Sequence, residues 1–189
     1  MTTDPIGKIE AALELSDDEL AEKLPDVLDE LEGQTEQLML EQPALFARVT
    51  QRMDAIDVGT LANEQPETVE QFQALLWTGM ELLVRASPDV QSSITDDISV
   101  NFQADDAPMT GHLELDGSSQ TITGGTDLLA EPDLSITGPA DELVGIITGS
   151  TDPIQGFMQQ RYQLEGPIQK GTQLAGTMGQ LTALLPDDD

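Results

Sequence analysis

The side chains of this chain that can do chemistry are almost all carboxylates. Its 189 residues include 36 Asp and Glu but only 7 Lys and Arg, one histidine and no cysteine. Three adjacent acidic pairs, Asp17-Asp18, Asp96-Asp97 and Asp105-Asp106, have the residue types for cation binding or proton transfer. None of them has the EF-hand loop spacing or its closing glutamate. We therefore interpret these pairs as solvated turns or helix caps.

The other residue types do not supply a catalytic site either. His112 stands beside Glu114 on the polar side of an alternating segment, which indicates a surface position. A single imidazole cannot build the histidine-rich or cysteine-rich sites typical of zinc, and a chain without cysteine has no thiolate and no disulfide. The sequence also contains no G-x-S-x-G elbow, P-loop or dinucleotide fingerprint. We therefore predict that this protein is not an enzyme and has no metal and no cofactor.

The formal net charge of −29 restricts the partners of the protein. Phosphate binding requires clustered Lys and Arg, so we exclude a nucleic-acid partner, and electrostatic docking on anionic membranes is disfavoured. Such acidity is typical of a disordered chain or of an acidic, halophilic protein adapted to high salt. A hydrophobic content of 38% with clear periodicity favours the second interpretation. At ~1 M salt the Debye length falls to roughly 3 Å, which screens the repulsion between surface carboxylates.

The location of the protein is predicted from two further features. The first ten residues, MTTDPIGKIE, have no basic-then-apolar signal pattern. No apolar run approaches the ~20 residues that span a bilayer. We therefore expect a cytoplasmic protein with no integral membrane segment.

The first part of the chain has the pattern of several helices, with apolar residues recurring at helical spacing. Pro25 and Pro43 are each suited to the first turn of a new helix. The stretch 59–66 is expected to be a linker, and a broad apolar stripe predicts a longer, core-facing helix over 67–86. We therefore predict an N-terminal helical extension over 1–60.

The middle of the chain has the alternation of β-strands. Apolar and polar residues alternate over 98–103 and over 109–116, and Asp116-Gly117 marks a tight hairpin turn. Three shorter strands are expected at 119–123, 134–136 and 162–165.

Three helices are expected around and after the last two strands. Two short helices begin near Pro139 and Asp152, and the second is expected to turn Phe157 and Met158 toward the interior. A final helix follows the fifth strand over about 168–185.

The stretch from Pro132 to Met178 has an ordered set of features. It has an acidic residue before a strand, a helix that ends in glycine, an Asp-Pro turn, a Phe-Met pair and a strand that ends in Glu-Gly. These features are Asp133, Gly149, Asp152-Pro153, Phe157-Met158 and Glu165-Gly166. In this order they resemble the sterol carrier protein 2 (sterol-binding domain) family, and the likeness covers about residues 70 to 186. Two positions depart from the family pattern: Gln160-Arg161 replaces the common Gly-Lys, and Glu131-Pro132 replaces the usual small residue.

This resemblance implies an α+β fold over 67–186, followed by an acidic tail at 187–189. The fold would be a curved, mostly antiparallel five-stranded sheet, covered on one face by helices that enclose an apolar tunnel. The tunnel would hold a fatty acyl chain, acyl-CoA, a sterol or an isoprenoid-type lipid. An alkyl chain needs only an apolar lining, worth ~0.8 kcal/mol per buried methylene, and methionines suit varied ligand shapes. The residues expected to line it are Phe102, Leu113, Leu115, Ile136, Leu143, Ile147, Phe157, Met158, Leu174 and Met178.

Two functions are compatible with these features. The first is a non-catalytic lipid carrier that holds its ligand under the short helices, with the final helix as a movable lid. The alternative is a protein-interaction or dimerisation accessory module in which the cavity is collapsed. In that module the N-terminal helices would bind a second copy or another protein. In both, Arg161 is expected to pair with a nearby carboxylate rather than with a lipid head group.

Overall fold

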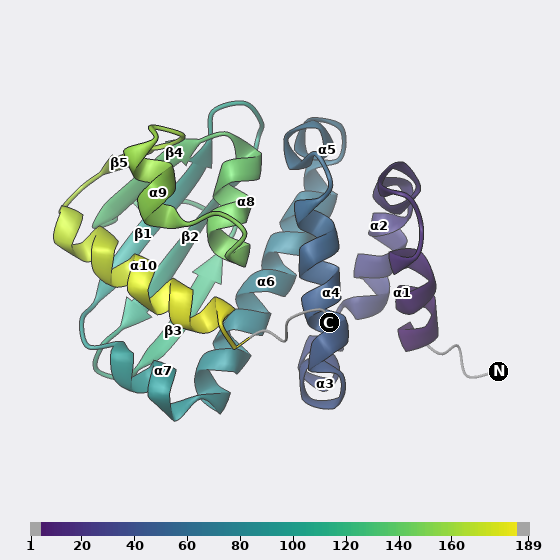
Figure 1. The fold of residues 1–189 in the computed structure, drawn as a ribbon, viewed down its shortest axis with the longest axis horizontal. Helices are drawn as coiled ribbons and strands as arrows, with labels where there is room; N and C mark the ends of the chain where they lie inside the picture. The colour runs from purple at the N-terminus through teal and green to yellow at the C-terminus, as the bar shows by residue number, and fades with distance from the viewer. Residues whose placement is uncertain (1–4, 185–189) are drawn as a thin grey trace.

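The computed structural model describes residues 5–184, which form a row of helices beside a helix-covered sheet (Figure 1). The row begins with α1 and ends with α6, which lies against the sheet. Its helices are α1 (Pro5–Leu13), α2 (Asp17–Leu31), α3 (Thr35–Glu41), α4 (Pro43–Asp54), α5 (Val58–Glu64) and α6 (Pro66–Ala86). The acidic tail predicted at 187–189 lies outside the described residues.

Five strands form one mixed sheet in the order β3-β2-β1-β4-β5. The central strands β1 and β4 run parallel, with Phe102 opposite Ile136, and the other three pairs are antiparallel. The predicted α+β class with a mostly antiparallel five-stranded sheet is therefore confirmed. The strands are β1 (Ile98–Ala104), β2 (Thr110–Asp116), β3 (Thr121–Gly125), β4 (Leu134–Gly138) and β5 (Gln163–Glu165).

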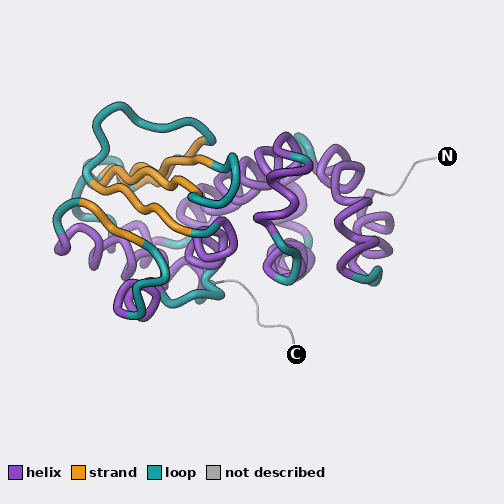
Figure 2. The backbone as a smooth tube through the Cα atoms, turned by 90° about the horizontal axis from the view of Figure 1, so that it is seen from above, coloured by secondary structure: helices purple, strands orange, loops and turns teal. Residues whose placement is uncertain are grey.

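One face of the sheet is apolar and is covered by helices. Alternating side chains such as Val100 and Phe102 on β1 and Leu113 on β2 point to this face and are buried. Figure 2 shows helices on one side of the strands and a long loop on the other. The covering helices that follow α6 are α7 (Pro88–Ser93), α8 (Ala140–Thr148), α9 (Pro153–Met158) and α10 (Ile168–Thr182).

The polar face of the sheet is crossed by the connection between β3 and β4. This connection passes over β2 and β1 because β3 and β4 lie on opposite sides of that pair. The Asn101 side chain exchanges two hydrogen bonds of 2.9 Å with the backbone of Leu129. The His112 Nδ1 atom lies 2.8 Å from the carbonyl oxygen of Asp127. His112 is thus a partly buried support for this connection, whereas we expected a surface residue.

Two expectations for the N-terminal helices are wrong. Pro25 lies inside α2 instead of starting a helix, because the buried Leu24, Val27 and Leu28 hold the chain helical on both sides of it. The expected linker at 59–66 is occupied by α5 and the start of α6. The Asp57 side chain caps α5 by accepting a hydrogen bond from the Thr60 N–H at 2.8 Å.

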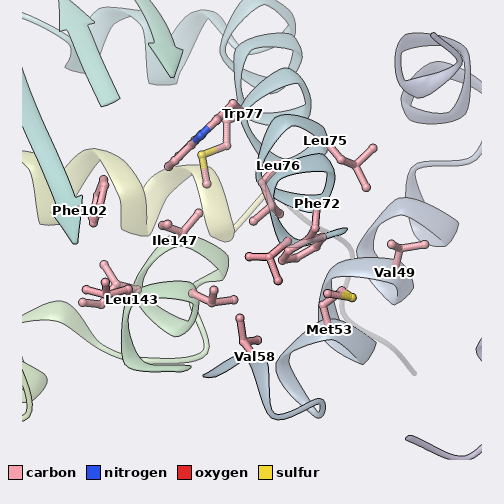
Figure 3. Packing of buried hydrophobic residues seen from close by; sticks show 14 of the residues in the cluster. Val49, Met53, Val58, Phe72, Leu75, Leu76, Trp77, Phe102, Leu143 and Ile147 are labelled. Carbon is pink, nitrogen blue, oxygen red and sulfur yellow. The ribbon is translucent and has the colours of Figure 1, made fainter. Parts of the chain in front are cut away.

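A continuous apolar core joins the row of helices to the sheet. Figure 3 shows Val49 and Met53 of α4 on one side of α6. Leu143 and Ile147 of α8 lie on the other side of α6. Phe72 of α6 is fully buried between them. Helix α6 therefore holds the two groups of elements together, although the domain division at 60–67 stays a prediction.

Candidate functional site

Most of the predicted lining residues meet between the sheet and the helices that cover it. Eight of the ten are buried, namely Phe102, Leu113, Leu115, Ile136, Leu143, Ile147, Leu174 and Met178. They come from β1, β2, β4, α8 and α10. The apolar periodicity of each element was thus sufficient to place these side chains in one shared interior.

A small apolar cavity of about 30 Å³ lies at the centre of this region. Its walls include four of the predicted residues, Phe102, Ile136, Leu174 and Met178, together with Pro153 at the start of α9. One water molecule occupies about 30 Å³ in the liquid, and pockets for drug-sized ligands measure about 300–1,000 Å³. This cavity is therefore closed to a ligand of that size, which could enter it only if α9 or α10 moved outward.

The remaining predicted residues are distributed around this cavity. Leu115 lines a separate cavity of about 130 Å³ between α7, the sheet and α10. Ile147 lines one of about 20 Å³ beside Phe46 of α4 and Met80 of α6. The assignment of all ten residues as ligand contacts stays a proposal.

The inward orientation expected for Phe157 and Met158 is wrong. Their side chains are 39% and 76% exposed on α9. The short helix instead turns Gly156 inward, where an added Cβ would lie 2.8 Å from the Tyr162 ring. Phe157 and Met158 stand at positions i+3 and i+4 from Ile154 and share its exposed face of α9, whereas Gly156 lies on a different face.

Tyr162 takes the interior position that we had expected for the Phe-Met pair. Its ring lines the 30 Å³ cavity, and its hydroxyl donates a hydrogen bond to the Pro153 carbonyl oxygen. Burial raises the pKa of the Tyr162 phenol. The sequence contained a signal for this burial, because Tyr162 and Leu164 alternate with polar residues as inward-facing residues of a β-strand do.

Trp77 was also absent from the predicted site. Its ring lies 6.1 Å from that of Phe102 between centroids, and its indole N–H donates to the Gly125 carbonyl oxygen at 3.1 Å. An added Cβ at Gly124 would lie 2.6 Å from the indole, so this glycine leaves room for the ring. Gly124 is therefore explained by the packing of α6, whereas a Cβ at the neighbouring Gly125 would lie 2.6 Å from the His112 ring.

Asp133, the acidic residue of the predicted motif, ties α10 to the sheet. Its carboxylate lies 2.8 Å from Lys170 Nζ on α10 and accepts a hydrogen bond of 3.0 Å from the Ser99 N–H on β1. The hydrogen bond from Lys170 and then the one from Ser99 lower the pKa of Asp133. The carboxylate is thus a structural connector between β1, β4 and α10.

Arg161 pairs with a carboxylate, as predicted. Its Nη1 atom lies 3.2 Å from Glu142 Oε1 on α8. In the described part of the chain, Arg161 Nε and Glu142 Oε2 are buried without a hydrogen-bond partner. The pair therefore joins α8 to the turn before β5 through one contact.

Three carboxylates meet where α5 approaches α8. Asp106 Oδ1 accepts a hydrogen bond from the Ala140 N–H at 2.9 Å, and Asp141 Oδ1 accepts one from the Val58 N–H at 2.8 Å. Partial burial, followed by the nearby charges of Asp57 and Asp106, raises the pKa of Asp141. Within residues 5–184 no group of three acidic, histidine or cysteine side chains is arranged to hold a metal ion.

A larger hollow of about 600 Å³ lies between α1 and α2. These two helices are far from the sheet (Figure 1). The hollow is lined by Ile9, Ala12 and Val27 together with the charged side chains of Lys8 and Lys23 and three acidic residues. Lys8 is already paired with Glu30. The hollow thus lacks the uniformly apolar walls of the smaller cavity.

The segment that contains most of the sheet and the helices α8, α9 and α10 is similar to a known protein family. Residues 102–179 match the model of the SCP-2 sterol transfer family. The match covers this segment, which is less than half of the chain. The resemblance predicted from Asp133, Gly149 and the features that follow them is therefore confirmed. No curated protein matches the chain, and none of the described helices is both long enough and apolar enough to cross a membrane.

Several solved structures are similar to this chain over part or most of its length. Apo sterol carrier protein 2 from Yarrowia lipolytica is 14% identical, with 57% of this chain and 90% of that chain covered and a TM-score of 0.44. Palmitated SCP2L2 from Aedes aegypti is 15% identical, with 55% and 90% covered and a TM-score of 0.41. The sec-alkylsulfatase Pisa1 from a Pseudomonas species is 14% identical, with 98% of this chain but 32% of that chain covered and a TM-score of 0.43.

Proposed function

We propose that this protein is a non-catalytic carrier that binds one apolar lipid between its sheet and the helices α8, α9 and α10. The observation that carries the proposal is the small cavity within the SCP-2 segment, whose walls are almost entirely apolar. Its described polar neighbours, such as Tyr162, are already hydrogen-bonded to the protein. Such walls favour an alkyl or isoprenoid chain, or a sterol, over a polar ligand.

Helix α10 is the element that would move to admit the ligand. It contributes Leu174 and Met178 to the wall, and it carries the exposed Gly176 and Gly179. A Cβ added at either glycine would meet no atom within 4 Å. These glycines therefore do not serve close packing, and their weak helix propensity is available for local opening.

The proposal also includes a role for the N-terminal helices. The N-terminal helical segment over 1–60 would support the binding domain over 67–186 through α6. The cytoplasmic location and the adaptation to high salt stay predictions. The alternative role as an interaction or dimerisation module would apply if the cavity never opens.

The first experiment is native mass spectrometry with organic extraction on protein purified in high salt. We expect a co-purified lipid at about one per chain, and binding of a fluorescent fatty acid by the delipidated protein. An empty protein that also fails to bind the fluorescent fatty acid in molar salt would contradict the carrier role and favour the interaction module.

A matched pair of variants tests the location of the ligand. Ala175 lines the cavity, so Ala175→Phe should fill the space and abolish fatty-acid binding. Ala183 is exposed just after the end of α10, so Ala183→Phe should bind normally. Circular dichroism checks that both variants are folded, and equal binding by both would place the ligand elsewhere.

A further inference from the structure

The acidic residues of this chain are scarce in one continuous part of it, residues 153–186. Residues 1–152 carry 32 of the 36 Asp and Glu, whereas residues 153–186 contain Glu165 alone, together with Arg161 and Lys170. This acid-poor segment comprises α9, β5 and α10. Both of its basic side chains are paired with carboxylates of the other part, Glu142 and Asp133. The outer surface of α9 and α10 is therefore nearly uncharged in a protein of net charge −29.

The same segment carries most of the exposed large apolar side chains. Seven such side chains are exposed in the described part of the chain, and five of them lie within 154–184. Ile154, Phe157 and Met158, which are 53%, 39% and 76% exposed, occupy positions i, i+3 and i+4 of α9 and so share one face. Ile168, 67% exposed, begins α10, and α9 contacts α10. An apolar face without acidic residues marks an interaction surface.

This apolar face adjoins the walls of the closed cavity. Pro153 of α9 and Gly171 of α10 line the cavity, and each is one to three residues from an exposed apolar side chain, Ile154 and Ile168 respectively. Figure 1 shows α9 and α10 as the outer layer over the sheet. A ligand that passes between these helices therefore meets an apolar surface at once.

We propose that α9 and the first turn of α10 dock on an uncharged or zwitterionic lipid surface, where the ligand is exchanged. The inference rests on the proposed carrier function. A lipid surface is favoured over a second copy because a dimer formed through this face would cover the route between α9 and α10. Anionic lipid would repel the acidic remainder of the protein, which is why the proposed surface is uncharged or zwitterionic.

The test measures binding of the full chain to phosphatidylcholine vesicles in molar KCl by flotation. We expect the wild-type protein to float with the vesicles and Met158→Asp to reduce the partition coefficient about ten-fold, since it replaces an inserted apolar group by a charge. The matched control is Leu40→Asp on α3, because Leu40 is 75% exposed but lies far from α9. Leu40→Asp should float like the wild type.

A second measurement separates docking from ligand binding. Because Met158 does not line the cavity, Met158→Asp should still bind a fluorescent fatty acid in solution. Normal fatty-acid binding with no flotation of the wild type would overturn the docking inference and leave the carrier role standing. Equal loss in both aspartate variants would also overturn it. A wild-type dimer by light scattering that becomes a monomer in Met158→Asp would assign the face to a second copy instead.

Discussion

Residues 1–152 and residues 153–186 differ in the charge of their surfaces far more than in how they pack into the core. Leu20 in α2 and Leu181 in α10 are equally buried, and both belong to the same apolar core. Outside the core, residues 1–152 carry 32 carboxylates, whereas residues 153–186 carry Glu165 alone. The two parts of the chain therefore share one apolar core and differ in the charge of their surfaces.

The salt dependence of the Tm should be the largest effect that distinguishes residues 1–152 from residues 153–186. Raising KCl from dilute buffer to about 1 M should raise the Tm by roughly 10 °C, because screening relieves repulsion worth several kcal/mol among the carboxylates of 1–152. Thermal unfolding followed by circular dichroism measures this shift. Glu165→Gln, which neutralises the one acidic residue of 153–186, should leave the salt dependence unchanged. A Tm that does not rise with salt would remove the idea of salt adaptation.

A pair of core substitutions should show which part of the core holds the ligand. Met178→Ala and Leu20→Ala each remove a buried side chain and should each destabilise the protein by about 2–5 kcal/mol. Only Met178→Ala enlarges the cavity that Met178 lines, so a saturating fatty acid should raise the Tm of that variant more. Equal stabilisation of both variants by the fatty acid would locate the ligand outside this cavity.

Substitutions at the glycines of α10, in the acid-poor segment, should change the stability by a smaller amount. Gly176→Ala and Gly179→Ala should each stabilise the helix by about 0.5–1 kcal/mol, since both positions have free space for a Cβ. If α10 opens to release the ligand, the double variant should also release a fluorescent fatty acid more slowly. Stopped-flow dilution measures the release, and unchanged rates would exclude α10 as the lid.

The ion pair between the two parts should have the smallest effect, and its sign depends on pH. The pKa of Asp133 is lowered by the hydrogen bond from Lys170 and then by that from Ser99. Its ionised form therefore stabilises the fold above the ordinary value of 3.8, and this stability is lost as the pH falls through the lowered pKa. Asp133→Asn should cost about 0.5–1 kcal/mol at pH 7, because the pair is partly exposed.

Chemical denaturation at several pH values checks this expectation. The difference between wild type and Asp133→Asn should shrink below pH 3.8. The control is Glu81→Gln, which removes an exposed pair with Arg85 within α6 and should change stability little at any pH. A difference that persists in acid would mean that Asp133 acts through packing and not through its charge.

Much of the fold could be predicted from short-range patterns in the sequence. Alternation over 98–103 and 109–116 located β1 and β2, and helical spacing over 67–86 located α6. The errors occurred where a pattern conflicted with packing. Pro25 has the chemistry of a helix start, but apolar neighbours on both sides keep it inside α2. The stretch 59–66 has no long stripe, yet its capped short helix is buried against α6 and α8.

The candidate site was predicted less completely than the fold. Apolar spacing assigned Phe102, Ile136, Leu174 and Met178 to the interior correctly. The same reasoning failed for Phe157 and Met158, because a six-residue helix is too short for its spacing to define a buried side. Trp77 was missed because its partners, the glycines of β3, have no side chain that signals a contact.

The sequence by itself determined the five strands, most of the residues that face the interior and the uneven distribution of charge. Only the tertiary structure decided which interior residues surround a space and which form solid core. Periodicity reports the direction of a side chain, whereas a cavity depends on the distance between layers. That distance follows from contacts between segments far apart in the chain, such as Asp133 with Lys170 and Tyr162 with Pro153.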